Sequence, residues 1–183
     1  MSRPLRSMCF CGPPNVGKKT ALFAHLLRYF DGDERELRRQ TMVVNCIVDP
    51  PGPDFVCSVL SPFASFACAG GARLRAVVFL YADHLGVDAQ TALRRCMELH
   101  SSTTRFFLVM YDDGQLIAPI RSRLRARRFS SSSSSSSTTN NMAASAMPTT
   151  SDPIDDLERD LCVRQAVWSG LGHLFVPDDG DNS

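Results

Sequence analysis

Apolar residues gather in short runs that turn-forming residues separate. Three runs have the continuous apolar character of strands buried on both faces, at residues 7–11 (SMCFC), 76–82 (AVVFLYA) and 104–111 (TRFFLVMY). A fourth strand is expected at residues 41–48 (TMVVNCIV), where β-branched residues precede a proline-rich turn. Arginine alternates with other residues at 121–129, a pattern typical of an edge strand with one basic face.

Two longer segments carry apolar residues at three- and four-residue spacings, which is the pattern of amphipathic helices. They are residues 18–30 (KKTALFAHLLRYF) and 88–100 (DAQTALRRCMELH), the second with Asp88 as its expected N-cap. Residues 55–60 (FVCSVL) fit either a short strand or the start of a helix. The alternation of strands and helices predicts an α/β fold, a parallel sheet flanked by helices. In such folds ligands bind at the carboxyl ends of the strands.

The last third of the chain has a different character. Residues 130–152 are rich in Ser, Thr and Asn and predict a low-complexity linker with little to bury. Residues 153–176 place apolar residues at helical intervals and predict one C-terminal helix, and residues 177–183 form an acidic tail. We therefore expect a core domain over residues 1–129 followed by a tethered helix.

Composition adds limits to this organisation. A chain of 183 residues with 44% hydrophobic content can bury one ordinary core. Twenty basic and nineteen acidic residues give no bulk attraction to nucleic acid or membrane, so such contacts would need a local patch such as residues 121–128. No run approaches the length of a membrane span, and the N-terminal residues do not resemble a signal sequence. An intracellular, soluble protein without a membrane partner is expected.

The cysteines also favour an intracellular protein. The seven cysteines are odd in number and scattered, and Cys46, Cys57 and Cys68 lie in apolar runs. Neither a disulfide framework nor a zinc site is suggested, and buried free thiols are expected. Cys9 and Cys11 would lie on the same face of their strand.

The first apolar run leads directly into GPPNVGKKT, residues 12–20, which departs at one position from the phosphate-binding pattern G-x-x-x-x-G-K-[ST]. In that pattern small residues let backbone N–H groups surround the phosphates at a helix N-terminus, and the lysine reaches the terminal phosphates. Lys19 replaces the hydroxyl that binds Mg²⁺, and Thr20 comes one residue late. ATP or ADP is the expected ligand, while the case for Mg²⁺ is weak. The candidate nucleotide-binding residues are Gly12, Pro13, Pro14, Asn15, Val16, Gly17, Lys18, Lys19 and Thr20.

Hydrolysis would also need acidic residues at the end of a second buried strand, to hold a metal and to prepare water. The segment VVFLYADHL supplies only Asp83, with Leu80 and Tyr81 in the two preceding positions. A glycine-proline turn without any ligand is the alternative interpretation of residues 12–20.

Residues 82–124 resemble the small subunits of the replication factor C clamp loader, AAA+ proteins that place the sliding clamp on primed DNA. The resemblance rests on ADHL, DAQTALRRCME, TRF and PIRSR, which follow in the family's order and spacing. GKKT and PIRSR are closest to the subunit 3 type. The resemblance covers about residues 7–128 and implies a P-loop AAA+ fold, other loader subunits, the sliding clamp and primed DNA as partners, and a nuclear location.

The resemblance also assigns roles to residues. The family's acidic box reads D-E-A-D where this chain has Leu80 to Asp83, and its polar sensor residue falls on Tyr111. Together with Lys19, these departures imply a non-hydrolysing subunit of an ATP-dependent complex, with no catalytic residue for its own site and no metal. Arg123, preceded by Ser122, falls on the arginine that reaches into the ATP site of the adjacent subunit.

Other functions also fit the sequence. One is an autonomous P-loop NTPase in which Thr20 and Asp83 hold the metal, and another is an interaction module that keeps the AAA+ scaffold without nucleotide. Arg123 would then be one of several arginines on an exposed strand. The family's segment before the loop and its C-terminal collar have no counterpart, which predicts a reduced protein or a partial sequence. Residues 153–176 would correspond to the first helix of the family's lid domain.

Overall fold

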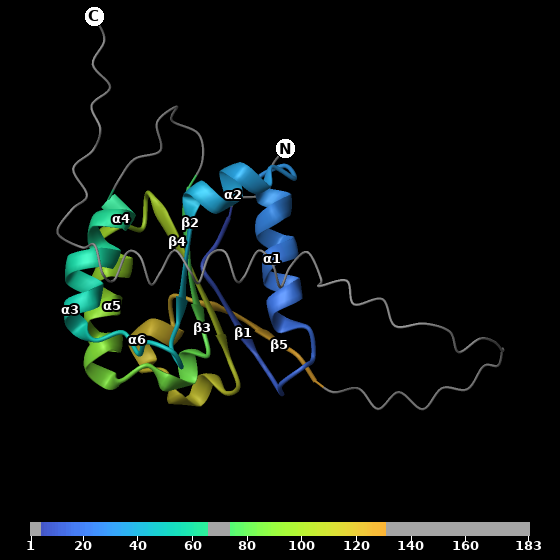
Figure 1. Ribbon diagram of the computed structural model, residues 1–183. Helices are drawn as coiled ribbons and strands as arrows, with labels where there is room; N and C mark the ends of the chain where they lie inside the picture. The colour runs from blue at the N-terminus through green and yellow to red at the C-terminus, as the bar shows by residue number, and fades with distance from the viewer. Residues whose placement is uncertain (1–4, 66–73, 131–183) are drawn as a thin grey trace, which may run out of the picture.

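Parallel strands form a five-stranded sheet in the computed structural model, which describes residues 5–65 and 74–130 (Figure 1). The strand order is β2-β3-β4-β1-β5, so β1 pairs with β4 on one side and with β5 on the other. Each strand is short and mostly buried, except for β5 at the edge. The bounds are Met8–Cys11 (β1), Thr41–Asn45 (β2), Arg75–Leu80 (β3), Thr104–Met110 (β4) and Arg125–Arg128 (β5).

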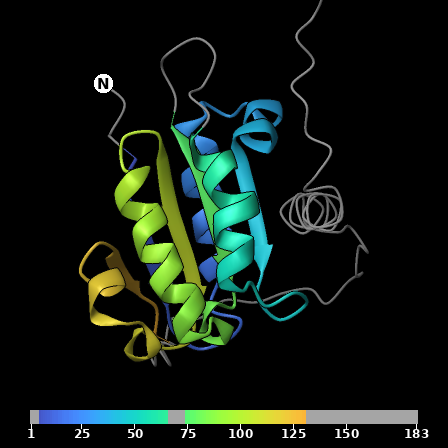
Figure 2. The same cartoon turned by 90° about the vertical axis from the view of Figure 1, so that its left-hand side faces the viewer.

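Helices cover both faces of this sheet (Figures 1 and 2). One face packs against α1, Lys18–Tyr29, and α2, Glu34–Gln40. The other packs against α5, Val87–Leu99, and a neighbouring helical segment that includes a π-helical turn. That segment comprises α3 (Pro53–Phe55), η1 (Val56–Leu60) and α4 (Ser61–Ser65). Short turns η2 (Ala82–His84), η3 (Asp113–Gln115) and α6 (Ala118–Arg121) follow β3 and β4. The predicted α/β architecture is confirmed.

Burial on both faces explains the continuous apolar runs. Successive side chains of a strand point to opposite faces, so each face of the inner strands needs an apolar surface. Phe10 and Phe107 pack with α1, whereas Phe79 and Phe106 pack with α5, and all four are fully or almost fully buried. The sheet thus separates two apolar cores, one on each of its faces.

Several predicted boundaries were wrong, each for a local reason. The strand expected at 41–48 ends at Asn45, whose side-chain oxygen accepts hydrogen bonds from the amides of Ile47 and Val48 and so turns the chain. The helix expected to be capped by Asp88 begins at Val87, with Gly86 as its N-cap. Residues 55–60 are helical.

The edge strand predicted at residues 121–129 is present, but it is shorter than expected. β5 covers Arg125–Arg128, and all four of its residues are exposed. The residues before it continue from α6, because Pro119 near the start of that helix favours a helical turn. Ser122 and Arg123 therefore lie in the connection between helix and strand.

Cysteine burial was predicted correctly in part. Cys46 and Cys96 are buried, and burial raises the pKa of each thiol to about 12. Cys9 and Cys11 lie on one face of β1 as expected, with their sulfur atoms 3.1 Å apart. Cys57 is exposed, contrary to expectation, because the turn at η1 points it away from the sheet-facing Val56 and Leu60.

The predicted linker at 130–152, apart from Ser130, lies outside the described residues, as do the predicted helix at 153–176 and the tail at 177–183. Within residues 5–65 and 74–130, every helix is too short or too polar to cross a membrane.

Gly12 occupies the junction where β1 meets its two neighbours. Its amide donates to the Tyr111 carbonyl oxygen at 3.0 Å, and the Phe129 amide donates to the Cys11 carbonyl oxygen at 2.7 Å. The backbone φ of Gly12 is 146°, and a Cβ atom there would overlap the Phe129 carbonyl oxygen. Only glycine fits this crossing of backbones.

Replacing Gly12 with alanine is therefore expected to lower the free energy of unfolding by about 2–3 kcal/mol, since strain and overlap coincide. Urea unfolding followed by circular dichroism measures this change. The matched control is Gly52→Ala, where a Cβ has no heavy atom within 4 Å, and the expected loss is below about 1 kcal/mol. Equal losses for both variants would contradict the role of the junction.

Candidate functional site

The predicted phosphate loop connects β1 to α1 at the carboxyl end of the sheet. Three loop residues have positive φ angles: Gly12 at 146°, Asn15 at 60° and Gly17 at 80°. These turns bring the chain round to the N-terminus of α1, which starts at Lys18. The strand, turn and helix context that a phosphate loop requires is present.

A cleft of about 590 Å³ lies beside this loop. The structure brings together Lys19, Tyr81 and Tyr111, which are far apart in the sequence. Gly12, Pro13 and Val16 are not among the lining residues, although they shape the loop. The cleft is lined by Pro14, Asn15, Gly17, Lys18, Lys19, Thr20, Leu80, Tyr81, Asp83, Val109, Met110 and Tyr111.

Lys18 folds back over the loop. Its ammonium donates to the carbonyl oxygens of Gly12 and Pro13. Burial lowers the pKa of Lys18, and the negative charge of Asp83 partly opposes this effect. The position is the one from which a lysine would meet phosphate oxygens held by the loop.

Lys19 lies against Tyr81, with its ammonium nitrogen 5.5 Å from the centre of the ring. Tyr81 directly follows β3 in a left-handed conformation (φ 57°), and 37% of it is exposed. A cation–aromatic contact thus occupies the positions at which the phosphate-loop pattern would supply a hydroxyl and an acidic residue. Leu80, the other acidic-box position, is fully buried against α1.

Three positions of this cleft do not carry the ligands that hold magnesium in phosphate-loop proteins. Magnesium prefers oxygen ligands and is usually held by carboxylates or hydroxyls together with phosphate oxygens. Lys19, Leu80 and Tyr81 provide no carboxylate, and in the described residues no group of three or more His, Cys, Asp or Glu side chains is placed to hold a metal ion.

Asp83 has a structural role that sequence reasoning missed. Its carboxylate accepts hydrogen bonds from the Tyr111 amide at 2.8 and 3.0 Å and from the Asp112 amide at 3.2 Å. The carboxylate thereby joins the end of β3 to the end of β4. No local spacing predicts this contact, because its partners lie 28 and 29 residues further along the chain.

Asp83→Ala is expected to lower the free energy of unfolding by about 1–3 kcal/mol, because the Tyr111 and Asp112 amides lose a charged acceptor. Thermal or urea unfolding measures the loss. The control is Asp88→Ala, in the exposed first turn of α5, where we expect at most about 1 kcal/mol. If Asp83→Ala leaves stability unchanged, the carboxylate does not hold the two strands together.

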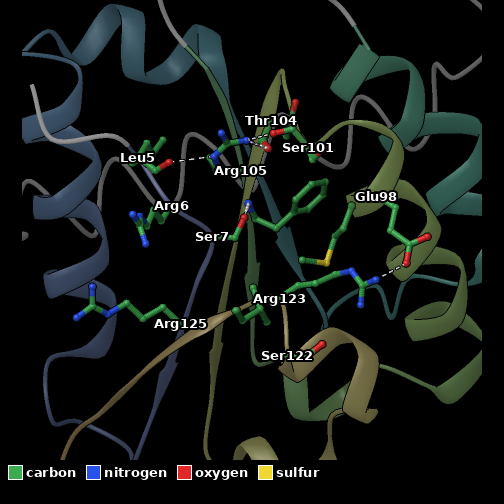
Figure 3. Close-up of a pocket in the computed structure, with 13 residues that line it drawn as sticks. Leu5, Arg6, Ser7, Glu98, Ser101, Thr104, Arg105, Ser122, Arg123 and Arg125 are labelled. Atoms are coloured by element: carbon green, nitrogen blue, oxygen red, sulfur yellow. Dashed lines mark hydrogen bonds and ion pairs between the residues drawn. The ribbon is translucent and has the colours of Figure 1, made fainter.

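A second cleft, of about 900 Å³, lies at the opposite end of the sheet (Figure 3). Four arginines line it: Arg6, Arg105, Arg123 and Arg125. Its other lining residues come from the segment before β1, the C-terminal half of α5 and the turn after it, the start of β4, and the connection between α6 and β5. A cleft with this excess of guanidinium groups is suited to an anion.

Arg123 is held by two contacts within the chain. One guanidinium nitrogen donates to the Pro119 carbonyl oxygen at 2.6 Å, and another lies 2.6 Å from Oε1 of Glu98 (Figure 3). The same Glu98 oxygen accepts from Arg94 at 3.0 Å. The Ser122 hydroxyl donates to the Pro119 carbonyl oxygen at 2.9 Å. Neither Glu98 nor Pro119 was predicted to contact Arg123.

Arg123 cannot join the phosphate loop of its own chain. β5 runs parallel to β1, with Arg125 opposite Met8. Arg123 therefore precedes the amino end of these strands, whereas Gly12 follows the carboxyl end, and the four-residue strand alone separates them by about 10 Å. A phosphate group that Arg123 contacts would therefore not be one that the loop of this chain holds.

Arg105 belongs to the TRF motif, and the sequence assigned it no role of its own. Its guanidinium donates to backbone carbonyl oxygens of Leu5, Ser101 and Thr104. Burial lowers the pKa of Arg105, and a nearby tyrosine partly opposes this. The side chain joins the segment before β1 to β4 and so forms one wall of the arginine cleft.

The sequence of this chain is similar to those of known clamp-loader small subunits. A replication factor C small subunit from Staphylothermus marinus is 37% identical over 128 residues, which is 70% of this chain and 38% of that protein. The corresponding protein from Methanosarcina acetivorans is 38% identical over 128 residues, and that from Natronomonas pharaonis 40% over 126. The resemblance to clamp-loader small subunits is confirmed. No protein-family model matches the chain.

The fold agrees with this relationship. A DNA polymerase III gamma subunit-related protein from Thermotoga maritima superposes with a TM-score of 0.51 at 14% identity, over 68% of this chain and 40% of the other. The predicted parallel sheet flanked by helices is confirmed, and that protein shares the fold. The chain spans less than two-fifths of the length of the clamp-loader small subunits compared here.

Proposed function

We propose that this chain is a divergent clamp-loader small subunit that does not hydrolyse ATP at its own loop. It would instead contribute Arg123 to the ATP site of a neighbouring subunit. The observation that carries the proposal is the separation of the two clefts. The loop with Lys19 and Tyr81 lies at one end of the sheet, and Arg123 at the other. The loop end of the sheet suits phosphate binding without hydrolysis. The opposite end suits a contact between Arg123 and the ATP site of a neighbouring subunit.

The guanidinium of Arg123 retains donors for such a role. Arginine has five N–H groups, and the contacts to Pro119 and Glu98 engage two of its nitrogens. The remaining donors can reach a phosphate oxygen across a subunit interface. There they would stabilise the charge that develops during phosphoryl transfer, as arginine fingers do.

The partners follow from the relationship to replication factor C small subunits. We propose that the chain assembles with other loader subunits and acts on the sliding clamp and on primed DNA through that complex. A nuclear location and a part in DNA repair belong to the same proposal. Purification of the tagged protein from its own cells tests it, because loader subunits and the clamp should accompany the chain. Their absence from a purification that recovers intact chain would contradict it.

Autonomous hydrolysis has one observation in its favour, since Thr20 lines the loop cleft. Asp83, the other residue this alternative needs, already accepts hydrogen bonds from two backbone amides. Magnesium-dependent turnover by the purified chain, abolished by Lys18→Ala, would restore the alternative. If the purified chain binds no nucleotide and no loader subunits accompany it, the interaction module is favoured.

In a reconstituted loader, Arg123→Ala is expected to lower ATP turnover at the neighbouring site by about 10³-fold, because an arginine that stabilises phosphoryl transfer contributes that order of magnitude. The measurement uses a loader whose other ATP sites are inactivated by substitution of their loop lysines, so that one site is observed.

Arg125→Ala is the matched control for this experiment. Arg125 is exposed and lines the same cleft, yet it points away from Glu98 and Arg123 (Figure 3). We expect turnover to fall by less than about threefold, with screened surface charge as the only loss. Similar decreases for both arginines would mean that the cleft acts through its general charge.

A further inference from the structure

The loop cleft suits phosphate groups, but it offers few ligands for the magnesium ion that usually accompanies them. The turns at Asn15 and Gly17 place the loop at the N-terminus of a twelve-residue helix, where backbone N–H groups favour anions. A Cβ atom at Gly17 would meet nothing within 4 Å, so the space next to the loop is open. Something other than a divalent cation must then balance the charge of a bound polyphosphate.

Two ammonium groups line this cleft. Lys18 and Lys19 line the same cleft, and Thr20 follows them. Lys18 contacts the loop carbonyl oxygens, and Lys19 extends to the Tyr81 ring at the end of β3. An aromatic face attracts a cation without neutralising its charge. Tyr81 thus holds the Lys19 ammonium beside the cleft.

We propose that this cleft binds a nucleoside di- or triphosphate as the free anion, without a divalent cation. The Lys19 ammonium supplies the positive charge that Mg²⁺ supplies in other phosphate-loop proteins. The inference builds on the nucleotide-binding loop of the proposed function and is independent of the role of Arg123.

The surrounding charges oppose a metal ion. A magnesium ion beside the bound phosphates would face the ammonium groups of Lys18 and Lys19, and like charges in a partly buried cleft repel. Asp83 is the lining carboxylate, and backbone amides already occupy it. Chelation also removes two negative charges from the nucleotide, which weakens its attraction to both lysines. Added Mg²⁺ is therefore expected to weaken binding.

The purified full-length chain tests this with ATP and ADP as probes in isothermal titration calorimetry. One series contains EDTA and the other excess MgCl₂, at equal ionic strength. We expect Kd in EDTA to be at least threefold lower than in MgCl₂. Binding that is tenfold tighter with MgCl₂ overturns the inference.

A chain that binds neither nucleotide at millimolar concentration also overturns the inference. That result leaves the proposed loader function standing, because the turnover measurement on Arg123 reports on the opposite end of the sheet. Conversely, ATP turnover that is unchanged in Arg123→Ala, together with tight nucleotide binding in EDTA, would contradict only the role of Arg123 at the neighbouring site.

Variants at residue 19 identify the source of the charge. Lys19→Ala should weaken binding in EDTA by at least tenfold, and Lys19→Arg should restore it to within threefold, because the charge returns. Lys19→Thr removes the ammonium that repels a metal ion, so Mg²⁺ should weaken binding less than it does in the unmodified chain. Tight binding by Lys19→Ala in EDTA would overturn the inference.

Two further variants complete the design. Tyr81→Leu removes the aromatic face against which Lys19 lies and should raise Kd in EDTA by about threefold. Arg28→Ala removes an exposed cation from the last turn of the same helix as Lys19 and should leave Kd unchanged. Circular dichroism melting curves confirm that each variant is folded. A Kd that rises as much for Arg28→Ala as for Lys19→Ala would show that net charge alone governs binding.

Discussion

The parallel pairing of β1 with β4 on one side and β5 on the other is the constraint on which both clefts depend. Because the strands run in one direction, everything that follows β1 gathers at one end of the sheet, and everything that precedes β5 gathers at the other. Gly12 allows this pairing, since its missing side chain lets the Phe129 carbonyl pass close to the loop. The separation of the phosphate loop from Arg123 is thus a property of the sheet.

The residues that replace the acidic box each have a place in the fold. Leu80 packs into the core on the α1 face, where an ionised carboxylate would need a partner to offset its desolvation. Tyr81 is placed by a left-handed turn beside Lys19. Asp83 uses its carboxylate oxygens to accept backbone hydrogen bonds. An isolated return of one acidic residue would therefore not rebuild a metal site.

Sequence reasoning succeeded where the signal is local. Continuous apolar runs predicted β3 and β4, because strands buried on both faces need apolar side chains throughout. The glycine pattern located the turn between β1 and α1. The end of β2 escaped prediction because Asn45 accepts hydrogen bonds from the backbone just after it, which apolar content does not reveal. The contacts of Asp83 with Tyr111 and of Arg123 with Glu98 join distant segments, so periodicity could not show them.

The contact between Arg123 and Glu98 has the strength that a transferable arginine needs. Both side chains remain more than a third exposed, at 37% and 38%. Exposed ion pairs contribute at most about 1 kcal/mol, because water screens the charges and the side chains lose rotamer freedom. Glu98 also interacts with Arg94, which divides its charge between two guanidinium groups. In the proposed trans role, a polyphosphate at a subunit interface would compete with Glu98 for Arg123. Glu98 would then orient the arginine before the polyphosphate binds.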